Sequence, residues 1–182
     1  MLFAIFLGII FLFFLAAAFL LFFGVRKTTL SAWEKLPRNR IAGGILGLLA
    51  LLAFIPNVRP LFPPEDYLGG LIFAAILLAG LCYAYLDYLF ARAFAGALIL
   101  LSHAVLIESF AAGLPGSGFF ALMCLAAGTF GIFIAAKPHW LRDFFRLLAR
   151  SSAWRLAVSL LCAAWSVSAL ILLVQQTGRI LR

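Results

Sequence analysis

Residues 2–23 read LFAIFLGIIFLFFLAAAFLLFF, an apolar segment without a single charged or polar side chain. About 20 apolar residues in an α-helix cross the roughly 30 Å hydrocarbon core of a bilayer. The segment has neither the positive start nor the small-residue cleavage site of a secretory signal peptide. It therefore predicts a permanent transmembrane helix.

The whole chain has the composition of a membrane protein. Of its 182 residues, 66% are hydrophobic and 11% are charged, whereas soluble domains carry about 25% charged residues. Long apolar runs favour helices, because the strands of a transmembrane β-barrel alternate in polarity over short segments. The connectors are too short for a soluble module, since independent domains need about 50 residues. We therefore expect an all-α, polytopic transmembrane helix bundle that forms a single integral membrane domain over residues 1–182.

Six apolar segments are separated by basic, proline-rich or glycine-rich connectors, and they follow one another as three hairpins. Residues 56–66 contain four prolines and predict a loop, and residues 114–118 predict a turn. The third and fourth segments are almost continuous near Arg92, so they form either a tight hairpin or one long bent helix. The predicted spans are residues 2–23, 41–55, 69–90, 93–112, 119–136 and 154–174.

The connector before the last span has an amphipathic pattern. Arg142, Arg146 and Arg150 recur at every fourth position, while leucine and phenylalanine gather on the other side. Such a pattern is typical of helices that lie in the headgroup layer with their apolar face toward the acyl chains. It predicts a basic amphipathic interfacial helix at about 138–150.

The basic residues are concentrated in alternate connectors. Of the 14 Lys and Arg residues, five lie between the first and second spans, one between the third and fourth, and five in the connector between the fifth and sixth when it is counted through Arg155. Only Arg59, Arg179 and Arg182 fall on the other side. Because short cytoplasmic loops accumulate Lys and Arg, we expect both termini outside the cytoplasm, in a bacterial inner (cytoplasmic) membrane.

Residues 100–110, LLSHAVLIESF, place a histidine and a carboxylate inside the fourth span. Ionisable groups at membrane depth cost about 2.5 to 3.5 kcal/mol on insertion scales, so they usually face protein or water. With the span beginning at residue 93, His103 lies about 15 Å along it, near the bilayer midplane, and Glu108 about 7 Å further. The two residues point to different sides of the helix, so a partner for either must come from another span.

Asp87 and Tyr83 share a face of the third span near its basic end. Together with His103 and Glu108 they are candidates for the lining of a solute or proton path. The alternatives are structural: Asp87 would pair with a basic residue of a nearby loop, Glu108 would reach the interface or pair with Arg59, and His103 would bond across a helix interface.

Other candidate residues concern contacts with lipid, with partner proteins or between helices. Gly43 and Gly47 have the GxxxG spacing that lets two helix backbones approach closely. Six basic residues are candidates for contact with anionic lipid headgroups, at about 1 kcal/mol each, or with an acidic partner protein. They are Lys35, Arg38, Arg40, Arg142, Arg146 and Arg150.

The chain contains no nucleotide-binding, metalloprotease or other catalytic motif, so we expect no cofactor, no metal and no nucleic-acid partner. The favoured function is transport or permeation of a small solute, ion or lipid through a polar-lined helix bundle. The first alternative is a non-catalytic structural or assembly subunit of a larger membrane complex, with other membrane subunits or further copies of the chain as partners. The second alternative is a lipid-modifying membrane enzyme.

Overall fold

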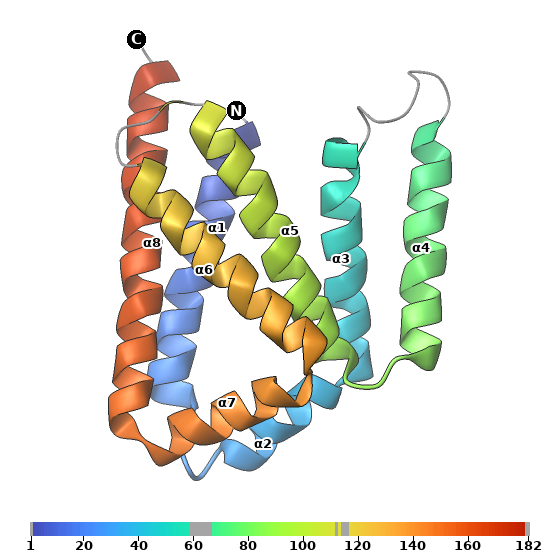
Figure 1. Cartoon of the computed structure of the whole chain (residues 1–182), viewed down its shortest axis with the longest axis vertical. Coiled ribbons are helices and arrows are strands. Elements are labelled where there is room, and N and C mark those ends of the chain that lie inside the picture. The colour runs from blue at the N-terminus through green and yellow to red at the C-terminus, as the bar shows by residue number, and fades with distance from the viewer. Residues whose placement is uncertain (1, 59–66, 112, 114–116, 181–182) are drawn as a thin grey trace.

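The computed structural model describes residues 2–58, 67–111, 113 and 117–180, and over these residues every regular element is a helix (Figure 1). The expectation of an all-α helix bundle is therefore confirmed. The predicted loop at 56–66 and the predicted turn at 114–118 lie largely outside the described residues, as do Arg59 and Arg182.

The helices follow one another along the chain with short connections. In order they are α1 (Leu2–Phe19), the π-helical segment η1 (Leu20–Gly24), α2 (Leu30–Lys35), the 3-10 turn η2 (Leu36–Arg38), α3 (Arg40–Val58), α4 (Tyr67–Tyr85), α5 (Leu89–Ala111), α6 (Ser117–Ala136), α7 (His139–Arg150) and α8 (Ser152–Ile180).

Five helical segments of the described chain are long and apolar enough to cross a membrane: α1 with η1, α4, α5, α6 and α8. α3 provides a sixth span when it is counted with α2 and η2, from which it is bent by 56°. The chain is thus a small integral membrane protein. The predicted bounds differ most at α4, which ends at Tyr85 rather than at 90, and at α8, which continues to Ile180 rather than ending at 174. At α8, polar residues continue the helix beyond the apolar segment that predicts it.

Helices that pack together are often distant in the sequence. α1 runs along α8, α5 runs along α6, and α3 lies between α5 and α4 (Figure 1). The chain alternates in direction as three successive hairpins require, and α1 begins and α8 ends at the end of the bundle opposite α2 and α7 (Figure 1). The third and fourth predicted spans are separate helices joined by a turn, in which Tyr88 has a φ of 55°.

A glycine explains why α3, rather than α4, packs closely on α5. A Cβ on Gly43 would overlap the backbone nitrogen of Phe90 and would lie 2.6 Å from the carbonyl carbon of Leu89. The two backbones can approach this closely only because Gly43 has no side chain. At Gly47 the contact is looser, since a Cβ there would lie 3.5 Å from Ala93 Cβ.

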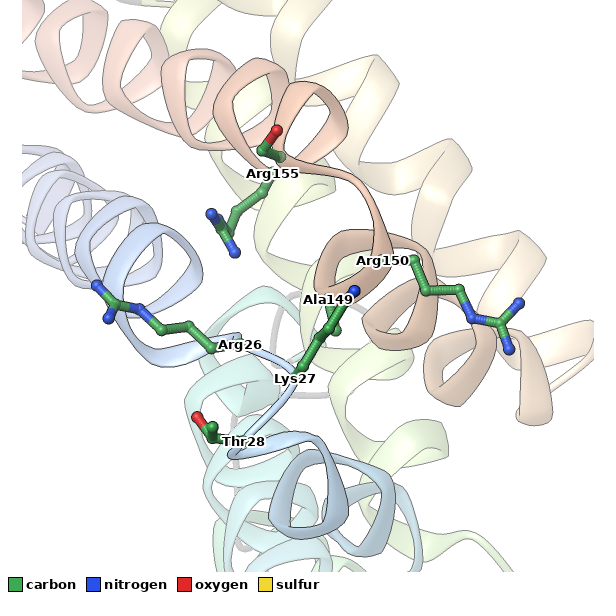
Figure 2. A pocket seen from close by; sticks show the side chains of 7 residues that line it. Arg26, Lys27, Thr28, Ala149, Arg150 and Arg155 are labelled. Atoms are coloured by element: carbon green, nitrogen blue, oxygen red, sulfur yellow. The ribbon is translucent and has the colours of Figure 1, made fainter.

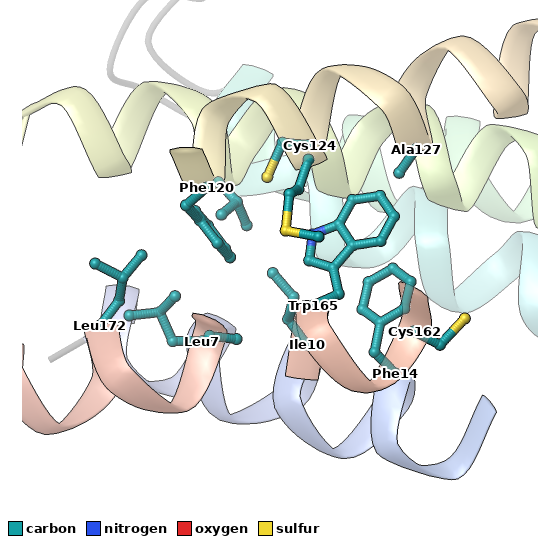
Figure 3. Packing of buried hydrophobic residues seen from close by; sticks show 12 residues of the cluster. Leu7, Ile10, Phe14, Phe120, Cys124, Ala127, Cys162, Trp165 and Leu172 are labelled. Atoms are coloured by element: carbon teal, nitrogen blue, oxygen red, sulfur yellow. The ribbon is translucent and has the colours of Figure 1, made fainter. Parts of the chain in front are cut away.

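An apolar cluster fills the space between α1, α5, α6 and α8 (Figure 3). The ring of Phe14 stacks on Trp165 with ring centroids 4.4 Å apart. Ser166 Oγ donates a hydrogen bond to the carbonyl oxygen of Phe11, 3.1 Å away, so a polar contact also joins α8 to α1. Stacking and an interhelical hydrogen bond therefore fix the pairing of the first and last spans.

α7 lies across one end of the bundle beside α2 (Figure 1). The ring of Trp33 on α2 packs on Phe145 of α7 with centroids 5.1 Å apart. The predicted helix at about 138–150 and its amphipathic pattern are confirmed, but its apolar face packs on protein rather than being left for acyl chains, because it is buried in a second apolar cluster that includes residues of α5 and α6. The buried residues of α7 are Leu141, Phe145, Leu148 and Ala149.

Candidate functional site

Two of the candidates for a solute path lie on the outer surface of α5. His103 and Glu108 are both exposed. The ring of Phe54 on α3 lies 6.4 Å from that of His103. From the rise of an α-helix, His103 lies about 21 Å and Glu108 about 29 Å from the start of α5. In a single chain within a bilayer, these two side chains would face lipid or the outer boundary rather than the interior of the bundle.

The other two path candidates lie near the basic end of the bundle. Tyr83 is 45% exposed and packs on α3, where a Cβ on Gly44 would lie 3.2 Å from Tyr83 Cδ2. Asp87 lies in the turn between α4 and α5, and its Oδ1 atom is 3.6 Å from Arg40 Nη2. This ion pair is exposed. It corresponds to the structural alternative for Asp87, in which the carboxylate pairs with a nearby basic residue instead of lining a solute path.

The interior of the bundle contains very little empty space at the level of Trp165. A cavity between α1, α5, α6 and α8 has a volume of about 10 Å³, which is at most enough for one water molecule. Its lining is apolar except for Ser102, and none of the four path candidates contributes to it. The cavity is therefore a packing gap between side chains.

An ion pair joins the two helices that lie across the basic end. Arg146 Nε of α7 is 2.6 Å from Glu34 Oε1 of α2. The hydrogen bond from Arg146 lowers the pKa of Glu34 below its ordinary value. Asp143 lies 3.5 Å from Arg146 and 3.4 Å from Arg142. Arg142 and Arg146 are thus the two basic contact candidates of this helix pair that have carboxylate partners within the chain.

The remaining basic contact candidates divide into two groups. Arg38 donates a hydrogen bond from Nη2 to the Tyr88 hydroxyl, 2.7 Å away, and Arg40 pairs with the carboxylate of the α4–α5 turn. Lys35 and Arg150 are exposed and have no carboxylate partner in the described part of the chain. They are the two candidates whose side chains have neither an ion pair nor a hydrogen bond in that part of the chain.

A pocket of about 490 Å³ opens at the basic end, between the α1–α2 connector and the turn from α7 to α8 (Figure 2). It is hereafter called the basic pocket. No lining residue is acidic, and four of them are Arg or Lys. The lining residues are Arg26, Lys27, Thr28, Ala149, Arg150, Ser152 and Arg155.

Hydrogen bonds hold the α1–α2 connector in shape. Trp33 Nε1 donates to the carbonyl oxygen of Gly24, 3.0 Å away. Thr29 Oγ1 accepts a hydrogen bond from the backbone N–H of Arg26 at 3.1 Å and donates to Gly24 O. These side chains replace the partners that the backbone groups lose where the helix ends, so the connector presents its basic residues from a fixed backbone.

Arg155 connects the other side of the basic pocket to this connector. Its Nη1 atom donates to the carbonyl oxygen of Val25 at 3.2 Å, while its Nε atom is buried and has no hydrogen-bond partner. Ser152, the first residue of α8, also lines the pocket. The positive end of the helix dipole of α8 therefore adds to the charge of the arginine and lysine side chains.

The arrangement is suited to anion binding, because it combines cationic side chains, hydroxyl groups and a helix N-terminus around one space. The sequence placed Arg26, Lys27 and Arg155 in basic connectors but did not single them out as contact residues, and it missed Thr28. The two halves of the pocket are more than 100 positions apart along the chain. No local spacing could indicate that they meet.

No protein-family model matches this sequence, and no curated protein and no solved structure matches it either.

Proposed function

We propose that the chain is a non-catalytic subunit of a larger membrane assembly, and that α5 carries a contact surface for its partner. The observation that carries the proposal is the outward placement of His103 and Glu108 on a helix of membrane-spanning length. Polar and ionisable groups that face hydrocarbon cost free energy, which a partner removes by offering hydrogen bonds. The partner is another membrane protein or a second copy of the chain.

The α5 contact surface consists of His103, Ile107, Glu108 and Phe110, all of which are exposed. At 100° per residue, His103, Ile107 and Phe110 lie within about 60° of one another, whereas Glu108 lies about 140° from His103, so the α5 contact surface extends around nearly half of the helix. Large apolar side chains next to one or two polar groups are typical of helix interfaces in membranes, where packing and hydrogen bonds drive association.

The same observations favour the subunit hypothesis over transport through this chain alone. The interior cavity of about 10 Å³ offers no polar route for a solute, and the path candidates do not converge on it. A solute path that used His103 and Glu108 would run between α5 and a partner chain. Transport would therefore also depend on the α5 contact surface.

The proposed orientation places the end with α2 and α7 in the cytoplasm of a bacterial inner membrane. Eleven of the 14 Lys and Arg residues belong to the connectors that meet at this end, which fits the positive-inside rule. A membrane-impermeant reagent added to sealed cells should label a cysteine placed after residue 182 in a cysteine-free variant. Labelling of a cysteine at Ser31 instead would reverse the orientation.

The assembly is tested by extracting the chain with its surrounding lipid and measuring the mass of the particle by native mass spectrometry. We expect a complex larger than the single chain of 19.9 kDa. The double variant His103→Leu/Glu108→Gln should dissociate it while the helix content, measured by circular dichroism, stays unchanged. Particles of single-chain mass from the unmodified protein would overturn the proposal.

Thr129→Val provides the matched control. Thr129 is also an exposed polar residue of a membrane-length helix, but its Oγ1 already donates to the carbonyl oxygen of Leu125 at 2.8 Å. Its own helix satisfies the hydroxyl, so this variant should keep the assembly intact. If the α5 double variant assembles as well as Thr129→Val does, the contact surface is not on α5.

A further inference from the structure

The basic pocket concentrates positive charge that the chain does not neutralise. Four of its seven lining residues are Arg or Lys, and none is acidic. The described carboxylates at this end are engaged with basic residues outside the pocket, in the pairs Glu34–Arg146, Asp87–Arg40 and Asp143–Arg142. Because like charges around one space repel one another, a bound anion would stabilise this end of the protein.

Two of the four basic side chains of the pocket extend into a common space. Figure 2 shows Arg155 and Lys27 extending into the space between the α1–α2 connector and the start of α8, while Arg26 and Arg150 extend outward on its two sides. The Val25 carbonyl holds one end of the Arg155 guanidinium, and its buried Nε–H lacks an acceptor. A guanidinium held at one edge is preorganised to donate to a tetrahedral anion from its remaining N–H groups.

We infer that the basic pocket binds a phosphate group, carried either by an anionic lipid headgroup or by a small phosphorylated solute. Phosphate matches the donor set, because it accepts several hydrogen bonds and carries the negative charge that the pocket lacks. Lys27 supplies a point charge, Arg155 supplies a fork of donors, and the Thr28 and Ser152 hydroxyl groups lie in the same lining. This inference does not depend on the assembly proposed for α5.

The start of α8 strengthens the case for phosphate. The first N–H groups of an α-helix have no partner within the helix, and phosphate groups commonly bind there. In α8 the N–H of Trp154 donates to Ser151 Oγ at 3.4 Å, so the donors at issue are the N–H groups before it. α8 has 29 residues and begins at Ser152 in the pocket lining. The pocket volume of about 490 Å³ lies within the usual range of roughly 300 to 1,000 Å³ for small-molecule sites.

The pocket also lies where lipid phosphates are found. Phe23, at the end of the first span, and Trp154, at the start of the last, are both more than 50% exposed. Aromatic side chains at the ends of transmembrane helices are typical of the headgroup level. A lipid phosphate would enter from beside these two rings, whereas a solute would enter between Arg26 and Arg150 from the aqueous side.

The test uses the full chain in lipid nanodiscs and two phosphate probes. One set of nanodiscs contains phosphatidylcholine alone and is titrated with inorganic phosphate, followed by ³¹P NMR. The other set includes phosphatidic acid, and retained lipid is counted by native mass spectrometry. Lys27→Gln should weaken the binding of the relevant probe about fivefold, as expected for the loss of one basic contact.

Lys35→Gln is the matched control, because Lys35 is also an exposed lysine at the basic end but does not line the pocket. It should weaken binding less than twofold. Retained phosphatidic acid without binding of inorganic phosphate would identify a lipid headgroup as the source, and the reverse result would identify a small solute. Equal losses from the two lysine variants, or no binding of either probe, would overturn the inference.

Discussion

Arg155 at the start of α8 donates a hydrogen bond from Nη1 to the carbonyl oxygen of Val25, 3.2 Å away and 130 positions earlier in the chain. Val25 is fully buried and follows directly on η1. The bond therefore joins the beginning of the last span to the end of the first. It also determines where Lys27 lies relative to α8, and hence the shape of the basic pocket.

Arg155→Met should lower the free energy of unfolding by about 1.5 kcal/mol, the contribution of a hydrogen bond from a charged donor. The measurement is unfolding by denaturant in mild detergent, followed by tryptophan fluorescence. Arg150→Met removes the same charge from the same pocket, but Arg150 has no ion pair or hydrogen bond from its side chain within the described chain. Equal destabilisation by the two variants would mean that net charge, rather than the bond to Val25, matters.

Gly43→Leu should separate α3 from α5 and lower the free energy of unfolding by about 2 to 3 kcal/mol, because overpacking against backbone atoms cannot be relieved by a rotamer change. Gly47→Ala should change it by less than about 0.5 kcal/mol, since the added Cβ would make an ordinary 3.5 Å contact with Ala93. Thermal unfolding of both variants in the same detergent checks that Gly43→Leu is the more destabilising of the two. A Gly47→Ala loss as large as that of Gly43→Leu would contradict the proposed close approach.

Replacement of Tyr88 should reveal the strain of the α4–α5 turn. Tyr88 has a φ of 55°, a region that costs residues with a Cβ about 1 to 2 kcal/mol. Tyr88→Gly and Tyr88→Ala both lose the hydrogen bond from Arg38. The difference between their free energies of unfolding therefore reports the backbone strain at this position. We expect the glycine variant to be more stable than the alanine variant by about 1 kcal/mol. The opposite order in a denaturant titration would show that the turn is not strained.

The Glu34–Arg146 ion pair should make the contact between α2 and α7 weaken in acid. The pKa of Glu34 is lowered in the folded protein, chiefly by the hydrogen bond from Arg146. Its stabilising effect is therefore fully present above the unfolded-state pKa of about 4.3 and is lost as the pH falls through the lower folded value. Thermal stability measured between neutral and acidic pH should fall less steeply in Glu34→Gln than in the unmodified chain. Parallel curves for the two proteins would show that the pair does not contribute.

Much of the fold follows from local properties of the sequence. Hydrophobicity along segments such as residues 2–23 predicted spans that the structure shows as helices, and the arginine spacing between 142 and 150 predicted the amphipathic face of α7. Predicted helix ends were less accurate, because Leu89 was assigned to the third span although it begins α5, and because α8 continues beyond residue 174 into polar residues. The GxxxG spacing drew attention to Gly43, but nothing comparable indicated Gly131, where a Cβ would lie 2.9 Å from the carbonyl oxygen of Ala95.

The candidate site was less predictable. No pattern in the sequence favoured Arg26, Lys27 and Arg155 over other basic residues, since a pocket depends on which turns are adjacent in space. It identified Asp87 as either a path residue or a partner of a basic loop, and the structure brings it to Arg40 at 3.6 Å. The sequence did not reveal whether His103 faces the interior of the bundle, because apolar residues are spread around α5 without a strong preference for one side and polar residues occur on more than one side.

Residue order alone was enough to predict a membrane-embedded helix bundle, a chain that reverses direction between successive spans, and basic connectors that gather at one end. The free energy of transferring a segment to lipid and the charge of a connector are nearly sums over their residues, so both can be read along the chain. The pairing of α1 with α8, the place of α3 between α4 and α5 and the basic pocket became visible only with the helices arranged in space. Inside lipid, helix association depends on the fit of two surfaces rather than on their hydrophobicity, and fit is a property of the pair.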